Sequence, residues 1–236
     1  MVERVKTGIP GLDDILKGGI PKGASVVVAG GSGCGKSILS MQYIYNGAVQ
    51  FNEPGLFVTI QTTTQNLLWD MQSFNWDIKK LQDQNLVKIE RLKFEDQSGD
   101  IEDQVTQQLL IIAKLVKEIK AKRLVIDSLT VLGLWIEDRG KLRNMLFRFL
   151  SAIKELDCTT ILTAETKGTP LDFSSFGVEE FVADGVIALY FFPPNRSIFV
   201  RKMRGTDHSK KVHPLEITQA GISLNPKDEI MWQTLR

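Results

Sequence analysis

The sequence predicts an α/β fold with a mostly parallel sheet flanked by helices and with antiparallel strands added at the C-terminal end. Three observations lead to this prediction. A glycine-rich segment stands between a strand-like run and a helix-like run near the N-terminus. Short apolar runs then alternate with amphipathic segments up to about residue 163, and after residue 185 strand-like runs follow one another without helices between them.

The glycine-rich segment, residues 30–37 (GGSGCGKS), matches the P-loop pattern of Gly, four residues, Gly, Lys and Ser. Glycines let the backbone approach a polyphosphate closely, so we expect the backbone to bind phosphate at Gly31, Ser32, Gly33, Cys34 and Gly35. Lys36 would reach the β- and γ-phosphate oxygens, and the Ser37 hydroxyl would hold Mg²⁺. A glycine loop without a ligand is the alternative, which the order of strand, loop and helix disfavours.

The first half of the chain is predicted in the following order. Residues 7–23 are rich in Gly and Pro around a short amphipathic turn with Leu12, Ile15 and Leu16. Strands are expected at 25–29, 56–60 and 86–90, and helices at 38–49 and from 64 to about 73.

The second half begins with a loop at 96–100 and a long amphipathic helix at 101–119. A strand at 123–127, a helix at 141–156 and a strand at 159–163 follow, and then strands at 185–192, 197–203, 212–218 and 221–224, with a turn at Pro193, Pro194 and Asn195. We expect one domain over residues 1–224 and a tail over 225–236. The tail, with Met231 and Trp232, is either an ordinary packed terminus or a segment that docks on a neighbour, and the first is favoured.

The composition excludes several classes of protein. A net charge of +1 gives no whole-molecule attraction for nucleic acid or membrane. No apolar run approaches the roughly 18 residues of a membrane span, and the N-terminus lacks an apolar signal core, so a cytoplasmic protein without membrane contact is expected. A disulfide between Cys34 and Cys158 is not expected. Cys34 is either a reactive thiol at a helix N-terminus or, more simply, a small loop residue.

Asp127 ends the apolar strand at 123–127, far downstream of the P-loop. In P-loop NTPases a carboxylate in this place helps to hold the metal, and both features belong at the carboxyl edge of a parallel sheet. Ser37 and Asp127 are therefore the candidate magnesium site, with Ser128 more simply a cap.

With these motifs the chain resembles the KaiC family of the RecA-like P-loop ATPases, and the resemblance covers nearly its whole length. Besides the P-loop it is carried by residues 7–13 (TGIPGLD), 18–23 (GGIPKG), 73–77 (SFNWD), 126–128 (IDS), 177–185 (GVEEFVADG) and 202–208 (KMRGTDH). The resemblance implies a RecA-like fold and a ring, a homo-hexamer, with ATP and Mg²⁺ between neighbouring subunits. A single domain of the family matches here.

The resemblance also assigns roles to later residues. It implies that Lys202 and Arg204 reach the γ-phosphate of the next subunit's nucleotide, and that Ser73 touches the nucleotide of its own subunit. The resemblance further implies that the base and ribose of the neighbour's nucleotide lie against Met203, Thr206 and His208. The spacing Lys-x-Arg on a strand places both cations on one face, although a solvated basic strand edge has the same pattern.

One departure from the family concerns catalysis. The family typically has two adjacent glutamates after the second strand, one of which polarises the attacking water, and this chain has Gln61 and Thr62 there. A neutral amide orients water but cannot accept its proton, and general-base catalysis is worth on the order of 10²- to 10⁴-fold. We therefore expect ATP binding with slow hydrolysis. Glu165 could replace the missing base, although the resemblance implies that this position senses the γ-phosphate.

Two further functions stay open. The chain could be a nucleotide-gated scaffold read by an unidentified regulatory protein, which Gln61 favours, or a recombinase paralogue in DNA repair. In the recombinases DNA is held by loops that correspond to residues 131–140 and 167–176. These loops carry the aromatic residues Trp135, Phe173 and Phe176 and the cations Arg139 and Lys167, but also Glu137, Asp138 and Asp172. Because the cations are few, DNA binding is not favoured.

Overall fold

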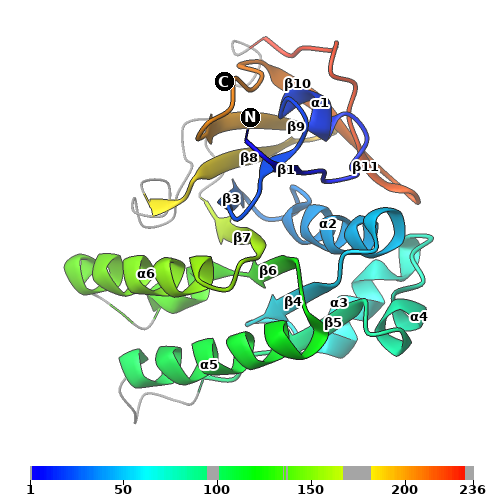
Figure 1. Ribbon diagram of the computed structural model, residues 1–236. Helices are drawn as coiled ribbons and strands as arrows, with labels where there is room; N and C mark the ends of the chain where they lie inside the picture. Colours follow the sequence, from blue (N-terminus) through cyan, green and yellow to red (C-terminus); the bar gives the residue numbers. More distant parts are fainter. Residues whose placement is uncertain (1, 95–100, 135, 137, 167–181, 232–236) are drawn as a thin grey trace.

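The main sheet of the protein has nine strands in the order β11-β10-β9-β8-β3-β7-β6-β4-β5 (Figure 1). The structure is a computed structural model, and it describes residues 2–94, 101–134, 136, 138–166 and 182–231. A separate pair of short strands, β1 (Arg4–Val5) and β2 (Ile20–Pro21), flanks the small helix α1 (Leu12–Ile15).

The parallel part of the sheet is formed by β3 and the strands that follow on one side of it. Its members are β3 (Ser25–Gly30), β4 (Gly55–Thr59), β5 (Val87–Arg91), β6 (Arg123–Asp127) and β7 (Thr159–Glu165). Every residue of β3 is buried, which suits its run of β-branched side chains because helices cover both faces of the sheet.

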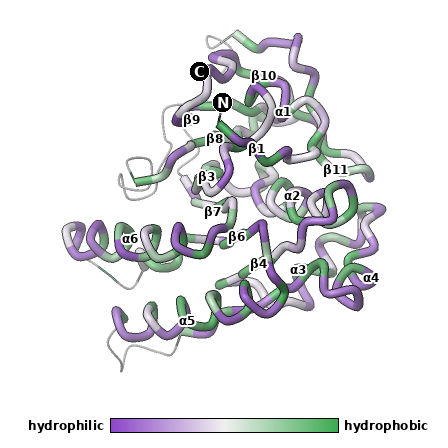
Figure 2. Tube along the Cα trace, in the orientation of Figure 1, coloured by the Kyte–Doolittle hydropathy of each residue, from purple (hydrophilic) through white to green (hydrophobic). Residues whose placement is uncertain are grey.

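Helices form a layer on each face. The face with Val26 and Val28 packs against α2 (Lys36–Phe51), α3 (Thr64–Asp70) and α4 (Ile78–Asp83), while the opposite face packs against α5 (Ile101–Ile119) and α6 (Arg139–Lys154). Figure 2 shows hydrophilic and hydrophobic bands alternating along α5 and α6, as expected for helices with one buried side. There are also two short 3₁₀ helices, η1 (Met71–Ser73) and η2 (Leu129–Leu134).

Antiparallel strands extend the other side of the sheet. The strands on this side are β8 (Gly185–Phe192), β9 (Asn195–Met203), β10 (Val212–Thr218) and β11 (Gly221–Ser223). Strand β8 is parallel to β3, and the pairs β8–β9, β9–β10 and β10–β11 are antiparallel. The Gln42 side chain of α2 both donates to and accepts from the backbone of Ile222, at 3.0 and 2.6 Å, and so ties β11 to the helix that follows the P-loop.

The predicted fold class is confirmed, and the differences are local. Helix α2 begins at Lys36 rather than at residue 38, and α6 begins at Arg139 because Asp138 caps it by accepting from the backbone N–H of Lys141 at 2.8 Å. The predicted helix from residue 64 is divided into α3 and η1. Helix α4 and strands β1 and β2 were not predicted, and the predicted loop at 96–100 lies outside the described residues.

The start of the tail pairs with the sheet. The backbone N–H of Ile230 donates to Val212 O at 2.8 Å, and the carbonyl of Asp228 is 2.7 Å from Nδ1 of His213. Met231 is exposed, and Trp232 lies outside the described residues. The boundary between a domain and a tail at residue 224 stays a prediction.

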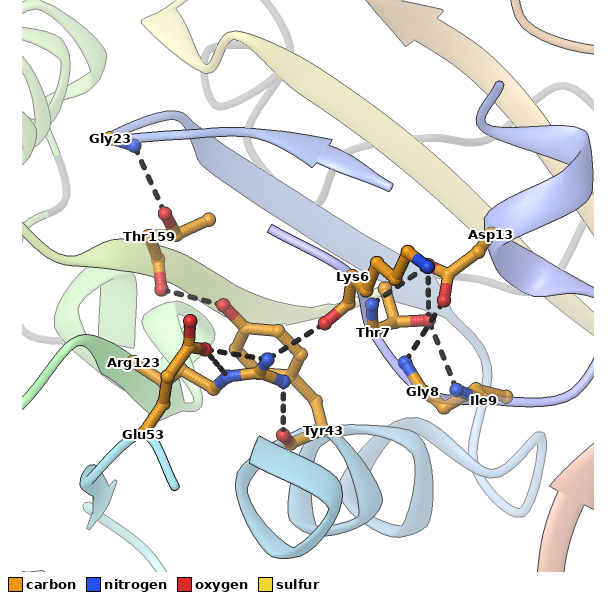
Figure 3. Close-up of polar contacts among 10 residues, drawn as sticks. All are labelled: Lys6, Thr7, Gly8, Ile9, Asp13, Gly23, Tyr43, Glu53, Arg123 and Thr159. Carbon is orange, nitrogen blue, oxygen red and sulfur yellow. Dashed lines mark hydrogen bonds and ion pairs between the residues drawn. The ribbon is translucent and has the colours of Figure 1, made fainter. Parts of the chain in front are cut away.

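A fully buried arginine connects the N-terminal segment to the helix that follows the P-loop (Figure 3). Arg123 of β6 pairs with Glu53 at 2.7 Å, and it donates to the carbonyls of Tyr43 and Lys6 at 2.9 and 2.8 Å. Its guanidinium also lies 4.6 Å from the centre of the Tyr43 ring. Because its charge is paired and most of its N–H groups are bonded, the guanidinium can be buried at this junction.

Helix α2 and the N-terminal segment are fastened further by hydroxyl and carboxylate groups. The Tyr43 hydroxyl donates to Thr159 O at 3.0 Å. The Asp13 carboxylate accepts from the backbone N–H groups of Thr7 and Gly8 and from the Thr7 hydroxyl (Figure 3). The two ends of the block at 7–13, which carries part of the family resemblance, are therefore hydrogen-bonded to each other. Among the described residues, no helix has both the length and the apolar character needed to cross a membrane.

Candidate functional site

The candidate site lies at the carboxyl ends of the parallel strands. The strand register sets it up, because Gly30 of β3 pairs with Glu165 of β7 and Thr59 of β4 pairs with Asp127 of β6. A cavity of about 290 Å³ opens there and is lined by Ser32, Gly33, Gly35, Lys36, Ser37, Ile38, Gln61, Thr62, Asp127 and Glu165. The three catalytic candidates outside the P-loop thus share one cavity with it.

The P-loop turns at the end of β3 and leads directly into α2. Gly33 and Gly35 adopt positive φ angles of 74° and 104°, which favour glycine. The N-cap of α2 is Gly35, which has no side-chain cap, and the first turn has no acidic residue. The N–H groups at this helix end are therefore not used by a capping side chain and suit an anion.

Lys36 folds back onto the loop that precedes it. Its Nζ donates to the carbonyls of Gly30 and Gly31, at 2.9 Å each. The lysine lines the cavity and is almost completely buried. These contacts place its charge beside the backbone that would hold phosphate.

Cys34 is a buried residue of the loop and is not among the residues that line the cavity. A Cβ on Gly30 would collide with the Cys34 sulfur. Burial raises the pKa of the Cys34 thiol, which is the opposite of what a reactive cysteine needs. The interpretation of Cys34 as a small loop residue therefore agrees with the structure, and both it and Cys158 are free thiols.

Ser37 and Asp127, the predicted magnesium residues, are in contact. The Ser37 hydroxyl donates to Oδ2 of Asp127 at 2.7 Å, and the Thr163 hydroxyl donates to Oδ1. These hard oxygen donors suit Mg²⁺, which is typically held by one or two carboxylates, waters and phosphate oxygens. The described residues contain no group of three or more His, Cys, Asp and Glu side chains that could hold a metal ion, so this pair would have to share Mg²⁺ with a phosphate.

Gln61 and Glu165 both line the cavity and are both exposed. Gln61 lies just beyond β4, where the Thr59 hydroxyl donates to Thr62 O at 3.0 Å and so fixes the turn. The backbone N–H of Glu165 donates to the Thr130 hydroxyl at 2.8 Å. The cavity therefore offers a neutral amide and one carboxylate as candidates for orienting water.

The cations predicted to act on a neighbour's nucleotide lie at the opposite end of β3. The backbone N–H of Arg204 donates to Asp184 O, and that of Asp184 to Ser25 O, at 2.9 Å each. Arg204 is thus level with the first residue of β3, whereas the P-loop leaves from the last, Gly30. Five residues of strand separate the two levels by about 16 Å. Lys202 extends toward the same end, where its Nζ donates to Ala183 O at 2.8 Å.

Arg204 is held loosely where it lies. Its side chain is 58% exposed, and its Nη1 is 3.5 Å from Oδ1 of Asp184, which also pairs with Lys154. An ion pair this exposed contributes little, so the guanidinium is available for another anion.

The three residues predicted to meet a neighbour's base and ribose differ in exposure. Met203 is buried in the core of its own subunit, so little of its side chain is free for a neighbour. Thr206 is half-buried and accepts from Arg4 at 2.8 Å. His208, also half-buried, lines a separate hollow of about 1180 Å³ beside α1. The roles of all three stay predictions.

Other predicted residues lie outside this cavity. Ser73 is exposed at the end of η1 and is not among the residues that line it. The neighbouring Phe74 and Trp76 stack at 4.5 Å, and Trp76 also stacks on Tyr45 of α2 at 5.5 Å. The block at 73–77 is therefore at least partly a packing motif.

The predicted DNA contacts are mostly beyond the described part of the chain. The loop at 167–176, with Lys167, Asp172, Phe173 and Phe176, lies outside it, as do Trp135 and Glu137. Of the named residues in these two loops, only Asp138 and Arg139 are described, and both belong to the start of α6. DNA binding stays the alternative prediction.

Two residues at the site were not predicted. Thr163 bonds to Asp127, and Arg196 of β9 donates from Nε to Gly33 O at 3.2 Å. The sequence predicts Thr163 in a strand, where threonine is common, and nothing in its local pattern indicates a polar partner. Arg196 follows the turn at Pro193 and Pro194, and only the pairing of β8 with β9 brings it to the P-loop.

Comparison with known proteins agrees with this geometry. The sequence profile of the KaiC ATPase family matches residues 5–229. The chain belongs to the KaiC family. It is 36% identical to a UPF0273 protein of Thermotoga maritima over 97% of this chain and 98% of that protein. It is 39% identical to a KaiC-like protein of Pyrococcus horikoshii whose crystal structure superimposes with a TM-score of 0.84, covering 96% of this chain and all of the other.

Longer relatives also match. The circadian clock oscillator protein KaiC of Parathermosynechococcus lividus is 35% identical over 95% of this chain, which covers 43% of that protein. The chain thus spans less than half the length of the KaiC clock proteins that it matches.

Proposed function

We propose that this KaiC-family chain binds ATP with Mg²⁺ between neighbouring copies of a homo-hexameric ring and hydrolyses it slowly. The observation that carries the proposal is the location of the two phosphate-binding groups at opposite ends of β3. The P-loop with Lys36 and Ser37 leaves from one end, and Lys202 and Arg204 lie at the other.

The P-loop end supports nucleotide binding by itself. The uncapped start of α2, the Lys36 ammonium and the oxygens of Ser37 and Asp127 meet in one cavity. A triphosphate needs backbone N–H groups, a cation and Mg²⁺, and the bound Mg²⁺ would screen the charge of the phosphates. The loop backbone and Lys36 would then orient the phosphates, and Asp127 would hold the Ser37 hydroxyl in place.

The separation of the cations from the cavity supports a shared site. A side chain of Arg204 cannot cover about 16 Å within its own subunit, because an extended arginine reaches roughly half that distance. Cations that face a phosphate from another copy stabilise transferred charge, as an arginine supplied in trans does in other NTPases. The exposure of Arg204 is compatible with such a contact.

Slow hydrolysis is supported by Gln61. It lines the cavity at the place where the family has a glutamate, and an amide cannot take the proton of an attacking water. The same observation favours the second candidate function, a nucleotide-gated scaffold, in which ATP holds the ring together for an unidentified regulatory protein to read.

The deciding experiment measures native mass with and without ATP and Mg²⁺, together with phosphate release. We expect assembly that depends on nucleotide and turnover that is slow but measurable. Assembly with no detectable turnover would favour the scaffold. A Lys36→Ala variant with unchanged ATP affinity would contradict both.

A further inference from the structure

Arg196 reaches the P-loop from the β8–β9 hairpin. It is the second residue of β9 and pairs with Phe191 of β8. Its guanidinium lies over the Phe191 ring, 4.3 Å from the ring centre, and its Nε donates to Gly33 O at 3.2 Å. A planar guanidinium that is stacked on an aromatic ring has few orientations open to it, so this donor is aimed at the loop.

Gly33 is one of the two loop glycines whose backbone has a positive φ. Glycine loses more backbone freedom on ordering than any other residue. The ring of Phe191 also approaches it, with Cδ1 3.8 Å from where a Cβ on Gly33 would be. Arg196 and Phe191 therefore both lie against the loop at Gly33.

The start of the loop, at Gly30 and Gly31, is held by a contact that nucleotide binding would remove. Lys36 holds the carbonyls of Gly30 and Gly31, and under the proposed function its Nζ turns to the phosphates instead. The buried side chain of Cys34 and the hydrogen bond from Arg196 would remain. The charge of Arg196 also acts within the loop, since it opposes the burial that raises the pKa of Cys34.

We propose that Arg196 is a positioning residue that keeps the P-loop in its phosphate-accepting shape once Lys36 has turned to a nucleoside triphosphate. The inference rests on the proposed nucleotide binding. It concerns a residue of the same subunit as the P-loop, so it does not depend on the ring.

The test compares the dissociation constants of Mg·ATP and Mg·ADP for the full chain and for Arg196→Gln by calorimetric titration. A lost charge-assisted hydrogen bond predicts binding of both nucleotides weaker by about tenfold. Arg196→Lys keeps the charge but not the fixed Nε donor, and it should give an intermediate affinity. Phe191→Leu removes the ring under the guanidinium and should weaken binding by a smaller factor in the same direction.

Arg201→Gln is the matched control, because it makes the same charge change on the same strand. Arg201 acts instead on Tyr190, whose pKa burial raises and the arginine charge lowers. Tyr190 belongs to the small cluster with Val186 and Ala188 rather than to the P-loop. The control should bind Mg·ATP within about twofold of the unaltered chain, since an exposed charge away from the site has little effect.

The outcomes separate this inference from the proposed function. A lower melting temperature of nucleotide-free Arg196→Gln with unchanged affinity would show a purely structural residue and overturn the inference alone. Equal weakening by Arg201→Gln would also overturn it, because the effect would then be one of net charge. If the unaltered chain bound neither nucleotide, the proposed function and the inference would both fail.

Discussion

Gln61 stands where the resemblance to the family implies a glutamate, and a single substitution tests its effect. Gln61→Glu places a carboxylate at the edge of the cavity, where it can accept a proton from water. We expect the rate of ATP hydrolysis to rise by about 10- to 100-fold, within the usual range of general-base catalysis. Phosphate release at saturating ATP measures it, and Gln65→Glu, the same change on the exposed side of α3, is the control.

Glu165 is the other candidate for the general base. If Gln61→Glu left turnover unchanged while Glu165→Gln abolished it, the carboxylate of β7 would be the base. The expectation drawn from Gln61 would then be wrong.

Because of Cys158, we expect the free energy of unfolding to fall as pH rises in the alkaline range. Burial raises its pKa to about 12, while an unfolded thiol ionises near 8.5. The neutral thiol favours the folded state, so its contribution is complete below about pH 8.5 and is lost as pH rises toward 12. The free energy of unfolding should fall by at most about 1.4 kcal/mol per pH unit in this window.

Urea unfolding at several pH values between 8 and 11 checks this expectation. Cys158→Ala removes the titrating group and should give a shallower fall with pH. Parallel curves for the two proteins would show that lysines and tyrosines account for the whole effect.

At the scale of elements, the contacts of Arg123 join the N-terminal segment, α2 and β6. Arg123→Met would leave Glu53 without its buried partner and the carbonyls of Lys6 and Tyr43 without a donor. Because Glu53 is 32% exposed, the main cost is that of the carbonyls left without a donor, about 1–3 kcal/mol for each, which chemical denaturation measures. The control is Arg148→Met, because Arg148 is 75% exposed and pairs only at the surface with Glu102.

The control should change the free energy of unfolding by less than about 1 kcal/mol. Similar losses for the two variants would mean that α2 and the N-terminal segment are held mainly by other contacts.

The elements that the sequence predicts well are those with a strong local pattern. The apolar run in β3 and the helical period of α5 locate these elements within a residue. A strand that is buried on both faces has a continuous run of apolar residues, and a helix that is buried on one face has apolar residues at helical spacing. Helix α4 has six residues, and the strands β1 and β2 have two each, so they are too short for a period to be visible. The P-loop is likewise local, whereas the contacts of Thr163 and Arg196 depend on strand pairing that no local pattern encodes.

At the scale of the whole molecule, a site shared between copies predicts complementation. Lys36→Ala disables the P-loop of its own copy, and Arg204→Ala disables the cation that the copy would offer its neighbour. Each variant alone should hydrolyse ATP far more slowly than the unaltered chain. When the two are mixed, intact sites form wherever an Arg204→Ala copy meets a Lys36→Ala copy in the right order.

Random mixing in equal amounts should restore about a quarter of the activity per chain, because each half of the site is intact in half of the copies. Phosphate release from the mixture, after disassembly and reassembly with ATP, measures this. A mixture no more active than the average of its components would place both functions in one copy.

Because the P-loop and Arg204 lie at the two ends of β3, a closed ring of copies would differ from an open row in how strongly it holds each copy. Each nucleotide site then has two half-sites, the P-loop of one copy and Arg204 of the next. In a head-to-tail contact each copy gives its P-loop to one neighbour and its Arg204 to the other. An open row of copies then always has one half-site unused at each end, and only closure into a circle completes every site. Loss of one copy from a closed circle breaks two junctions at once, so bound triphosphate would oppose the first departure more strongly than any later one.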